Sequence, residues 1–333
     1  MRCEFAPARS TLQAALTMPP DLAAIRAAHA RIRDKIHRTP VLTNAALDAA
    51  CCGALFFKCE NLQEAGAFKA RGATNAVFSL SDAGAARGVA THSSGNHAAA
   101  LARAARLRGI PAYIVMPSNS AKSKIRNVES YGGRITFCAP TQQAREEICA
   151  RLIAETGAVM VHPFTDDRVM AGQGTAVLEL LEDAPNLDLI LCPVGGGGLL
   201  AGTAIAAKGL RPRIKVIAVE PAGAGDAAQS FHSGHLVPLD HANTIADGLR
   251  TTVGAPNFAV MQQLVDDVVT VSEEAIVAAM RQLWETLKII VEPSGAVPYA
   301  AVIERKLDVT GRRVGLILTG GNVDLDALPW MKR

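Results

Sequence analysis

Short apolar runs alternate with helical stretches along most of the chain, and glycines or polar residues separate them. Apolar runs of this length, bounded by turn residues, are typical of buried strands. We expect strands at 54–59, 88–91, 112–116, 133–137, 159–161, 189–194, 215–219 and 314–318. A first helix is expected from its N-cap Asp21 to a stop at Thr39–Pro40. Further helices are expected from Lys69 and over 97–108, 142–156, 199–208 and 272–289.

Strands that alternate with helices form parallel sheets with right-handed crossovers. One such series begins near Gly88, and a second begins after Asp166–Asp167. The pattern therefore predicts an α/β fold in which two doubly wound parallel-sheet lobes enclose a cleft. We expect a large ligand-binding domain from residues 1–87 and 166–333, and a small mobile domain from residues 88–165.

The composition excludes several classes of partner. The chain has 333 residues, 49% of them hydrophobic, which is enough for about two domains. With 34 basic and 31 acidic residues and only 4% aromatics, it lacks the basic surface and stacking side chains of a nucleic-acid-binding protein. No apolar run reaches the roughly 18 residues of a membrane span. We therefore expect neither nucleic acid nor a membrane as a partner.

The cysteines and the first residues indicate the compartment. Seven cysteines are scattered and none forms a CxxC pair, so neither zinc nor a disulfide framework is expected. Residues 12–18 form only a short apolar stretch before Pro19–Pro20, which makes a poor signal peptide, and we expect a loose N-terminal extension instead. These features favour a reducing, cytoplasmic location.

Lys69 is the first candidate for covalent chemistry. It follows Phe68 just beyond an apolar strand, with Gly66 three residues before it and Gly72 three residues after it. A desolvated lysine amine loses its proton readily and attacks an aldehyde. A solvated surface lysine is the alternative, so the interpretation depends on the other parts of the site.

Four glycines, Gly195, Gly196, Gly197 and Gly198, follow an apolar strand and precede a helix. Exposed backbone N–H groups and the positive end of a helix suit a phosphate. No Gly-Lys-Ser/Thr follows, and no GxGxxG with a spaced acid occurs, so neither a P-loop nor a dinucleotide fold is indicated. A tight strand-to-helix turn is the alternative, but such a turn does not need four glycines.

Two polar loops offer further ligands. Residues 93–97, Ser-Ser-Gly-Asn-His, could bind a carboxylate at the start of the next helix, or could simply cap that helix. A Ser/His/Asp hydrolase is not indicated, because GxSxG is absent. Glu220 and Asp226 lie six apart on a glycine-bearing loop and could hold a hard divalent cation, although surface acids in a turn are the commoner explanation.

A lysine, a glycine turn for an anion and polar loops, including Thr-Gly-Gly-Asn at 319–322, are the parts of a site for pyridoxal 5′-phosphate. The motifs GAFKARGA, HSSGNH, AGQGT, PVGGGGLLAG and LTGGN, in that order, resemble those of serine racemases and serine/threonine dehydratases. These are fold-type II pyridoxal-phosphate enzymes, and the resemblance runs from about Asp21 to Leu325. It implies a tryptophan synthase β-like fold with the cofactor in the cleft between the lobes.

The resemblance assigns roles to individual residues. The lysine bound covalently to the cofactor would be Lys69, Asn96 would contact the phenolic oxygen, and Thr319 would contact the pyridine nitrogen. The cofactor-binding set implied is Phe68, Lys69, Asn96, Gly195, Gly196, Gly197, Gly198 and Thr319. The loop for the substrate carboxylate would comprise Ser93, Ser94, Asn96 and His97. Ser94 matches the acid/base that racemases of this group place opposite the lysine. A magnesium site (or one for Mn²⁺ or Ca²⁺) would use Glu220, the carbonyl of Ala224, and Asp226.

Two further matches bear on the substrate. Arg145 resembles an arginine at the side-chain end of the substrate in serine racemases and 3-hydroxyaspartate dehydratases, and a guanidinium fits a second carboxylate. An exposed helix arginine is the alternative. The segment 291–295, Val-Glu-Pro-Ser-Gly, also resembles that branch. Asn44–Ala45, in contrast, replaces a serine pair that helps some racemases to bind nucleotide.

The resemblance implies β-elimination of a small β-hydroxy amino acid, such as serine, threonine or 3-hydroxyaspartate, to a 2-oxo acid and ammonia, with accompanying racemase activity. A hydroxyl such as that of Thr319 would leave the pyridine nitrogen unprotonated, which favours expulsion of a β-substituent. The alternatives are an enzyme that is primarily a racemase, a β-replacement enzyme of the cysteine synthase type, and an amino-acid sensor without activity. A homodimer is implied by the resemblance alone.

Overall fold

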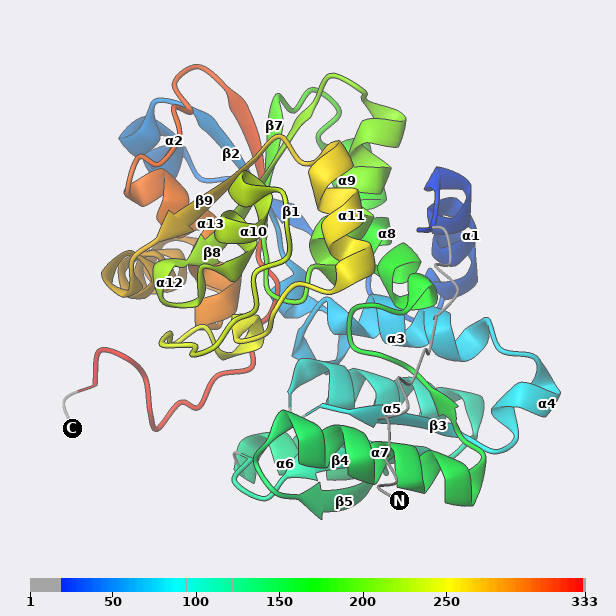
Figure 1. Cartoon of the computed structure of the whole chain (residues 1–333). Helices are drawn as coiled ribbons and strands as arrows, with labels where there is room; N and C mark the ends of the chain where they lie inside the picture. The colour runs from blue at the N-terminus through cyan, green and yellow to red at the C-terminus, as the bar shows by residue number, and fades with distance from the viewer. Residues whose placement is uncertain (1–18, 94, 121, 332–333) are drawn as a thin grey trace, which may run out of the picture.

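The computed structural model describes residues 19–93, 95–120 and 122–331, and its larger part is built on a six-stranded sheet (Figure 1). The strands lie in the order β1-β2-β10-β7-β8-β9. Their bounds are β1 Val41–Leu42, β2 Ala54–Lys58, β7 Leu189–Pro193, β8 Lys215–Pro221, β9 Asp267–Val271 and β10 Arg313–Ile317. All neighbouring strands are parallel except β1, which pairs antiparallel with β2. The predicted parallel sheet therefore carries one antiparallel edge strand.

A second, four-stranded sheet forms the smaller part of the molecule, at the bottom of Figure 1. Its strands lie in the order β5-β4-β3-β6 and are all parallel. Their bounds are β3 Val89–His92, β4 Ala112–Pro117, β5 Arg134–Cys138 and β6 Val159–Met160. This sheet is made of one continuous stretch of the chain, within residues 89–160. The predicted α/β fold with two parallel sheets is confirmed.

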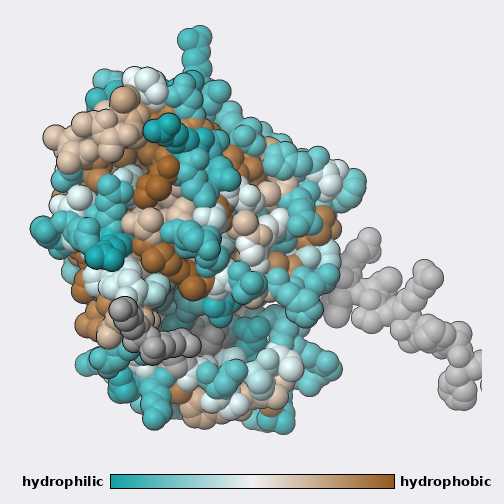
Figure 2. Space-filling model, turned by 90° about the vertical axis from the view of Figure 1, so that its left-hand side faces the viewer, coloured by the Kyte–Doolittle hydropathy of each residue, from teal (hydrophilic) through white to brown (hydrophobic). Residues whose placement is uncertain are grey.

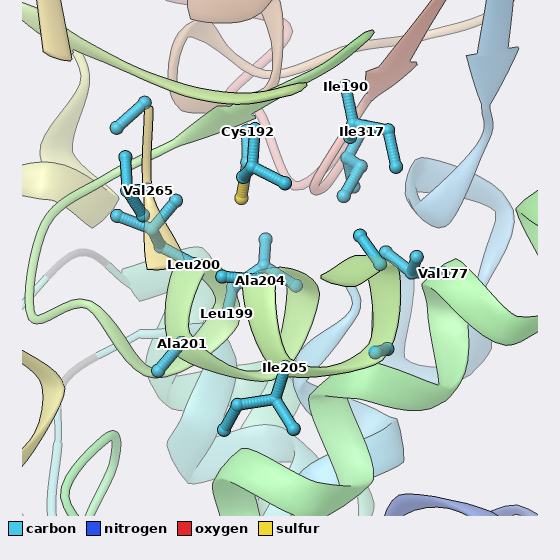
Figure 3. Close-up of a cluster of buried hydrophobic side chains, with 14 of the residues drawn as sticks. Val177, Ile190, Cys192, Leu199, Leu200, Ala201, Ala204, Ile205, Val265 and Ile317 are labelled. Carbon is cyan, nitrogen blue, oxygen red and sulfur yellow. The ribbon is translucent and has the colours of Figure 1, made fainter. Parts of the chain in front are cut away.

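Helices cover both faces of the large sheet, because each face carries its own hydrophobic core. On one face lie α1 Leu22–Ile32, α8 Asp167–Asp183, α9 Gly198–Leu210 and α11 Ala255–Leu264. On the other lie α2 Ala45–Cys51, α12 Glu273–Leu287 and α13 Pro293–Ile303. Figure 3 shows how α9 places Leu200 and Ala204 below Ile190, Cys192 and Ile317 of the sheet.

The small sheet is covered in the same way. Its helices are α3 Lys69–Phe78, α5 Asn96–Arg108, α6 Lys122–Ser130 and α7 Gln142–Thr156, with the short α4 Asp82–Ala85 before β3. The last helix, α10 Asp226–Ser233, belongs to the large part, where it packs against β9 and α11. Side chains of α3, α5 and α6 form one core with the sheet, and side chains of α7 form the other. Because α3 also packs against α8, it joins the two parts of the molecule.

Four buried charged side chains lie where α3, α8 and β2 meet. Arg71 and Lys58 are fully buried, as are their partners Glu60 and Glu179 to within 2%. Arg71 donates from Nε to Glu60 Oε2 at 2.7 Å and from Nη2 to Glu179 Oε2 at 2.7 Å. Lys58 Nζ donates to Glu179 Oε2 at 2.6 Å. Two cations and two anions therefore neutralise one another at the first turn of the helix that begins with Lys69, to which Arg71 belongs.

Two helix ends differ from the prediction. Asp21 caps α1 as expected, accepting from the backbone N–H of Ala24, but the helix ends at Ile32 and not at Thr39–Pro40. Thr39 is instead held against the large sheet, because its carbonyl accepts from Lys58 Nζ and its hydroxyl donates to Glu60. The last long helix ends at Leu287, since Lys288 adopts a left-handed conformation with φ 58°.

The surface carries a hollow between the larger and the smaller part, with hydrophilic side chains along its visible wall (Figure 2). Within the described residues, none of the helices has both the length and the apolar character that crossing a bilayer requires. The N-terminal extension expected before residue 19 lies outside the described part of the chain.

Candidate active site

Lys69 is the first residue of α3, at the end of a sharply bent connection from β2. Ala65 and Gly66 both adopt left-handed conformations, with φ 56° and 71°. The next residues then pair with the segment after β10, because Phe68 N donates to Thr319 O at 3.0 Å and Ala67 forms a bridge with Gly320. The turn and this pairing together fix where the lysine side chain begins.

Lys69 is half-buried with its amine end desolvated, and this amine has a single polar partner among the described residues. Nζ donates to the carbonyl of Pro163 at 2.8 Å and lies 5.0 Å from the ring centre of Phe68. Burial without a carboxylate partner lowers the pKa of this amine to about 8. About a tenth of the amine is then neutral at pH 7, which suits a nucleophile or a base.

The four glycines form the turn between β7 and α9. Gly197 has φ +86°, and α9 begins at Gly198. A Cβ on Gly196 would lie 2.4 Å from the ring of Phe164, and a Cβ on Gly198 would lie 2.8 Å from the carbonyl oxygen of Phe164. Glycine is therefore required by close packing as well as by conformation. The turn presents bare backbone N–H groups at a helix N-terminus, an arrangement that binds phosphate.

Pro163 and Phe164 connect the two ends of this site. These consecutive residues contact the amine of Lys69 and the glycine turn, respectively. The segment is itself held by His162, whose Nδ1 accepts from the backbone N–H groups of Phe164 and Thr165. The backbone of Pro163 and Phe164 therefore fixes the distance between the Lys69 amine and the glycine turn. A ligand bound at both ends would have to span this distance.

Asn96, the first residue of α5, belongs to a polar network that joins four segments. Its Nδ2 donates to Glu292 Oε1 at 2.8 Å, and its Oδ1 accepts from Asn322 Nδ2 at 2.9 Å. Asn322 Nδ2 also donates to the carbonyl of Ala65, beside the lysine turn. Burial raises the pKa of Glu292 to about 8, so this carboxyl is largely protonated at neutral pH. Neither Glu292 nor Asn322 was among the predicted site residues, although both lie in the quoted motifs.

The remaining candidates lie around the same centre. Thr319 is buried after β10. Ser93 follows β3, and its hydroxyl accepts from the backbone N–H of Gly95. His97 is buried with Nε2 facing the carbonyl of Val161, and its Nδ1 has no hydrogen-bond partner among the described residues. Ser94 lies outside the described residues.

Arg145 lies on α7 and is half-buried. It is close enough to His92, at the end of β3, to help lower the pKa of that imidazole, although burial is the larger cause. Its Nε is buried and has no hydrogen-bond partner among the described residues. The guanidinium therefore retains donor capacity beside the loop that contains Ser93.

The proposed metal ligands lie together at the end of β8. Glu220 is fully buried and accepts from the backbone N–H groups of Ala227 and Ala228, and Asp226 accepts from Val253 N. Burial raises the pKa of Glu220 to about 8, with the charge of Asp226 contributing, and burial also raises the pKa of Asp226 to about 6. No group of three or more His, Cys, Asp or Glu side chains that could hold a metal ion occurs in the described ranges. The donor set is two carboxylates and the backbone of Ala224.

Residues 32–320 match the family model described as "Pyridoxal-phosphate dependent enzyme". The chain belongs to this family. The resemblance drawn from the sequence motifs is thereby confirmed, and pyridoxal 5′-phosphate (PLP) is the cofactor. The left-handed Gly197, the close packing around Gly196 and Gly198, and the buried low-pKa amine of Lys69 all fit a phosphorylated aldehyde. Lys69 would bind its aldehyde carbon and the glycine turn its phosphate.

Individual relatives show which members of this family the chain is similar to. It is 50% identical over 313 residues to a serine racemase of Arabidopsis thaliana, covering 92% of this chain and 95% of the relative. It is 50% identical over 304 residues to a beta-hydroxyaspartate dehydratase of Paracoccus denitrificans, covering 91% and 96%. The solved structure of maize serine racemase superposes with a TM-score of 0.91 at 48% identity, covering 92% of this chain and 95% of that one.

The pKa of Lys69 predicts how cofactor loading depends on pH. Only the neutral amine attacks an aldehyde, and burial lowers its pKa from 10.5 to about 8, so the neutral fraction rises steeply between pH 7 and pH 9. The rate at which PLP attaches to cofactor-free protein is expected to follow, with a midpoint near pH 8. Stopped-flow absorbance measures this rate, and a midpoint above pH 10 would contradict the desolvated site.

Proposed function

We propose that this protein deaminates a small β-hydroxy amino acid by β-elimination, giving a 2-oxo acid and ammonia, and that it also racemises its substrate. The water lost in the elimination is taken up again when the released enamine hydrolyses. The observation that carries the proposal is the buried amine of Lys69, held 2.8 Å from a backbone carbonyl and joined through Phe164 to a phosphate-type glycine turn. Relatives named as serine racemase and as beta-hydroxyaspartate dehydratase, each 50% identical, support both activities.

The residues of the site have separate roles in the proposed reaction. When bound, PLP withdraws electrons from the Cα of an attached amino acid. Lys69, with its pKa lowered to about 8, takes the Cα proton. The N–H groups after β3, in the loop that includes Ser93 and Asn96, orient the substrate carboxylate at the start of α5. Thr319 would face the pyridine nitrogen with a hydroxyl, which leaves that nitrogen uncharged and favours loss of the β-hydroxyl.

The test is to incubate the purified enzyme separately with serine, threonine and 3-hydroxyaspartate. The 2-oxo acid and ammonia are measured together with the chirality of the remaining amino acid. We expect 2-oxo acid from at least one of the three, with the opposite enantiomer also accumulating from that substrate. If none of the three yields either product, the proposal is wrong.

Ser94 is proposed as the acid that reprotonates Cα on the face opposite Lys69, an assignment that rests on the sequence resemblance. Because elimination needs only the lysine face for an L-substrate, replacing Ser94 with alanine should reduce racemisation more than elimination. The comparison of the two rates on one enzyme preparation tests this, and equal losses would reject the role.

Arg145 is proposed to bind the second carboxylate of a dicarboxylic substrate. Replacing Arg145 with alanine is expected to reduce kcat/KM for 3-hydroxyaspartate by about 10- to 100-fold while changing kcat/KM for serine by less than about threefold, since a charge-assisted hydrogen bond contributes roughly 1.5–3 kcal/mol. Arg151→Ala is the matched control, because Arg151 is an exposed arginine on the same helix, α7. An unchanged preference between the two substrates would eliminate the acidic-substrate hypothesis.

Glu220, Asp226 and the carbonyl of Ala224 are proposed to hold Mg²⁺, with Mn²⁺ or Ca²⁺ as substitutes. The two carboxylates are buried side by side with raised pKa values, and neither has a basic side chain as an ion-pair partner among the described residues. A divalent cation would neutralise both, and oxygen ligands of this kind suit a hard ion.

Magnesium is therefore expected to stabilise the fold. At a concentration of about 100 times Kd, a ligand specific to the folded state contributes roughly 2.7 kcal/mol, which raises the melting temperature by several degrees. Glu220→Gln should abolish the effect of added MgCl₂, whereas Glu274→Gln, at an exposed position on α12, should retain it. A shift of the same size in all three proteins would show that the ion binds elsewhere.

The domain boundaries, the oligomeric state and the cellular location are further proposals. We assign residues 1–87 and 166–333 to a large PLP-binding domain and residues 88–165 to a small mobile one. A homodimer is consistent with the exposure of Leu62 and Ile290, two large apolar side chains on segments that are joined where Asn61 Nδ2 donates to the carbonyl of Ile290. Light scattering on the purified protein tests the oligomeric state. A cytoplasmic location is proposed from the scattered cysteines.

A further inference from the structure

Asn257 lies on α11, outside the motifs that mark the site, and its side chain reaches the glycine turn. It is 1% exposed. Its Nδ2 donates to the carbonyl of Gly196 at 2.6 Å and to the carbonyl of Phe164 at 2.9 Å. The amide of Asn257 therefore links the glycine turn to Phe164. Phe164 directly follows Pro163, whose carbonyl contacts Lys69.

These hydrogen bonds fix a peptide plane. The Gly196 carbonyl accepts a second hydrogen bond from Gly254 N at 3.1 Å, so two donors hold it toward α11. In a planar trans peptide the C=O and the following N–H point in opposite directions. The N–H of Gly197 is consequently directed away from α11. That N–H belongs to the turn at the N-terminus of α9, a position suited to binding an anion.

Packing strengthens the constraint. A Cβ on Gly197 would lie 2.9 Å from the Cβ of Asn257, so the turn and α11 are in direct contact. A Cβ on Gly254 would lie 3.3 Å from Asn257 Nδ2, so the loop before α11 closes over the same amide. The amide cannot be displaced without moving the turn, the loop or Phe164.

We propose that Asn257 is a positioning residue for the PLP phosphate. It acts through the carbonyl of Gly196 to aim the N–H of Gly197 at the phosphate, and it keeps Phe164 packed on the turn. The inference rests on the cofactor and not on the reaction, so it survives if the substrate assignment fails.

The test compares PLP with pyridoxal, which lacks the phosphate. Full-length protein freed of cofactor is titrated with each compound, and the absorbance of the lysine-bound form gives Kd. Asn257→Asp replaces both donated hydrogen bonds with repulsion, so Kd for PLP is expected to rise about 10- to 100-fold. Kd for pyridoxal is expected to change by less than about twofold. Gln262→Glu is the matched control, because Gln262 is an exposed amide on the same helix, and it should change neither value.

The ratio of Kd for PLP to Kd for pyridoxal shows whether Asn257 acts at the phosphate site. Equal weakening of PLP and pyridoxal would assign Asn257 a general structural role, and an unchanged PLP affinity would remove it from the phosphate site; either result overturns the proposal. Thermal melting checks that the variants fold. If Asn257→Asp does not fold, Asn257→Ser, which keeps one donor and adds no charge, is measured in the same way, with a smaller but still phosphate-specific loss expected.

Discussion

Replacement of Lys69 by alanine abolishes amino-acid turnover and the absorbance of the lysine-bound cofactor together; this is the largest effect we expect from a single substitution. The amine supplies both the covalent attachment and the base, and positioned acid–base catalysis alone contributes roughly 10²- to 10⁴-fold. The kcat of Lys69→Ala should therefore fall at least about thousandfold. Steady-state assays of 2-oxo acid formation and a visible spectrum measure the two losses.

Folding should survive this change, because the amine contributes only one hydrogen bond, to the carbonyl of Pro163. A melting temperature close to that of the wild type would confirm that the loss is chemical. Lys215→Ala, at an exposed position at the start of β8, is the control and should retain full activity. Turnover by Lys69→Ala within tenfold of the wild type would refute the assignment of the nucleophile.

The second large effect is expected from Glu179, and it concerns stability. Glu179 is the shared partner of Arg71 and Lys58, and both cations are fully buried. Removing one partner of a buried ion pair leaves an uncompensated charge, which typically costs about 3–5 kcal/mol. Glu179→Ala is therefore expected to lower the free energy of unfolding by about that amount, measured by urea denaturation. Total stabilities of about 5–15 kcal/mol make this a loss of at least a fifth.

The matched control is Glu182→Ala on the same helix. Glu182 pairs with Arg38 at 2.8 Å, but both side chains are about half exposed, and such a pair contributes roughly 0–1 kcal/mol. A similar loss for both variants would show that burial does not govern the cluster.

The buried charges around Glu179 also make the stability of the fold depend on pH in the acid range. Burial alone would raise the pKa of Glu179, but His29, whose Nε2 lies 3.6 Å from Glu179 Oε1, and the hydrogen bonds from Arg71 outweigh it and hold this pKa well below its usual range. A depressed carboxyl pKa contributes stability at neutral pH that is lost as the pH falls. The wild type should therefore lose more stability than Glu179→Gln between pH 6 and pH 3.

Most of the sheets could be predicted from the sequence because each strand is a local signal, an apolar run bounded by glycine or polar residues. Helix α8 was not predicted: every residue from Val169 to Leu181 is buried, so no polar face gives a helical period. Helix α13 contains Pro293 and Pro298, which local rules place at helix boundaries. Tertiary burial, which the pattern does not encode, stabilises both helices.

The residues of the candidate site could likewise be predicted only in part from the sequence. Lys69 and the four glycines are conspicuous because their chemistry depends on residue type. The partner of Lys69 is a backbone carbonyl, that of Pro163, and a carbonyl has no residue signature. Asn257 meets Gly196 across 61 positions of sequence, on a helix that was not predicted. Arg71 and Glu179 look like ordinary helix charges until the packing of α3 on α8 brings them together.

The central place of β10 has a consequence for biosynthesis. It is the last strand along the chain, yet it lies between β2 and β7. On the ribosome, these two strands have open edges until residues 313–317 emerge, whereas all four strands of the other sheet are available by residue 160. Since domains fold as units during synthesis, the smaller sheet can form on the nascent chain early, but the larger one must wait until β10 has emerged. Chains released early would expose two unpaired strand edges, which are templates for aggregation.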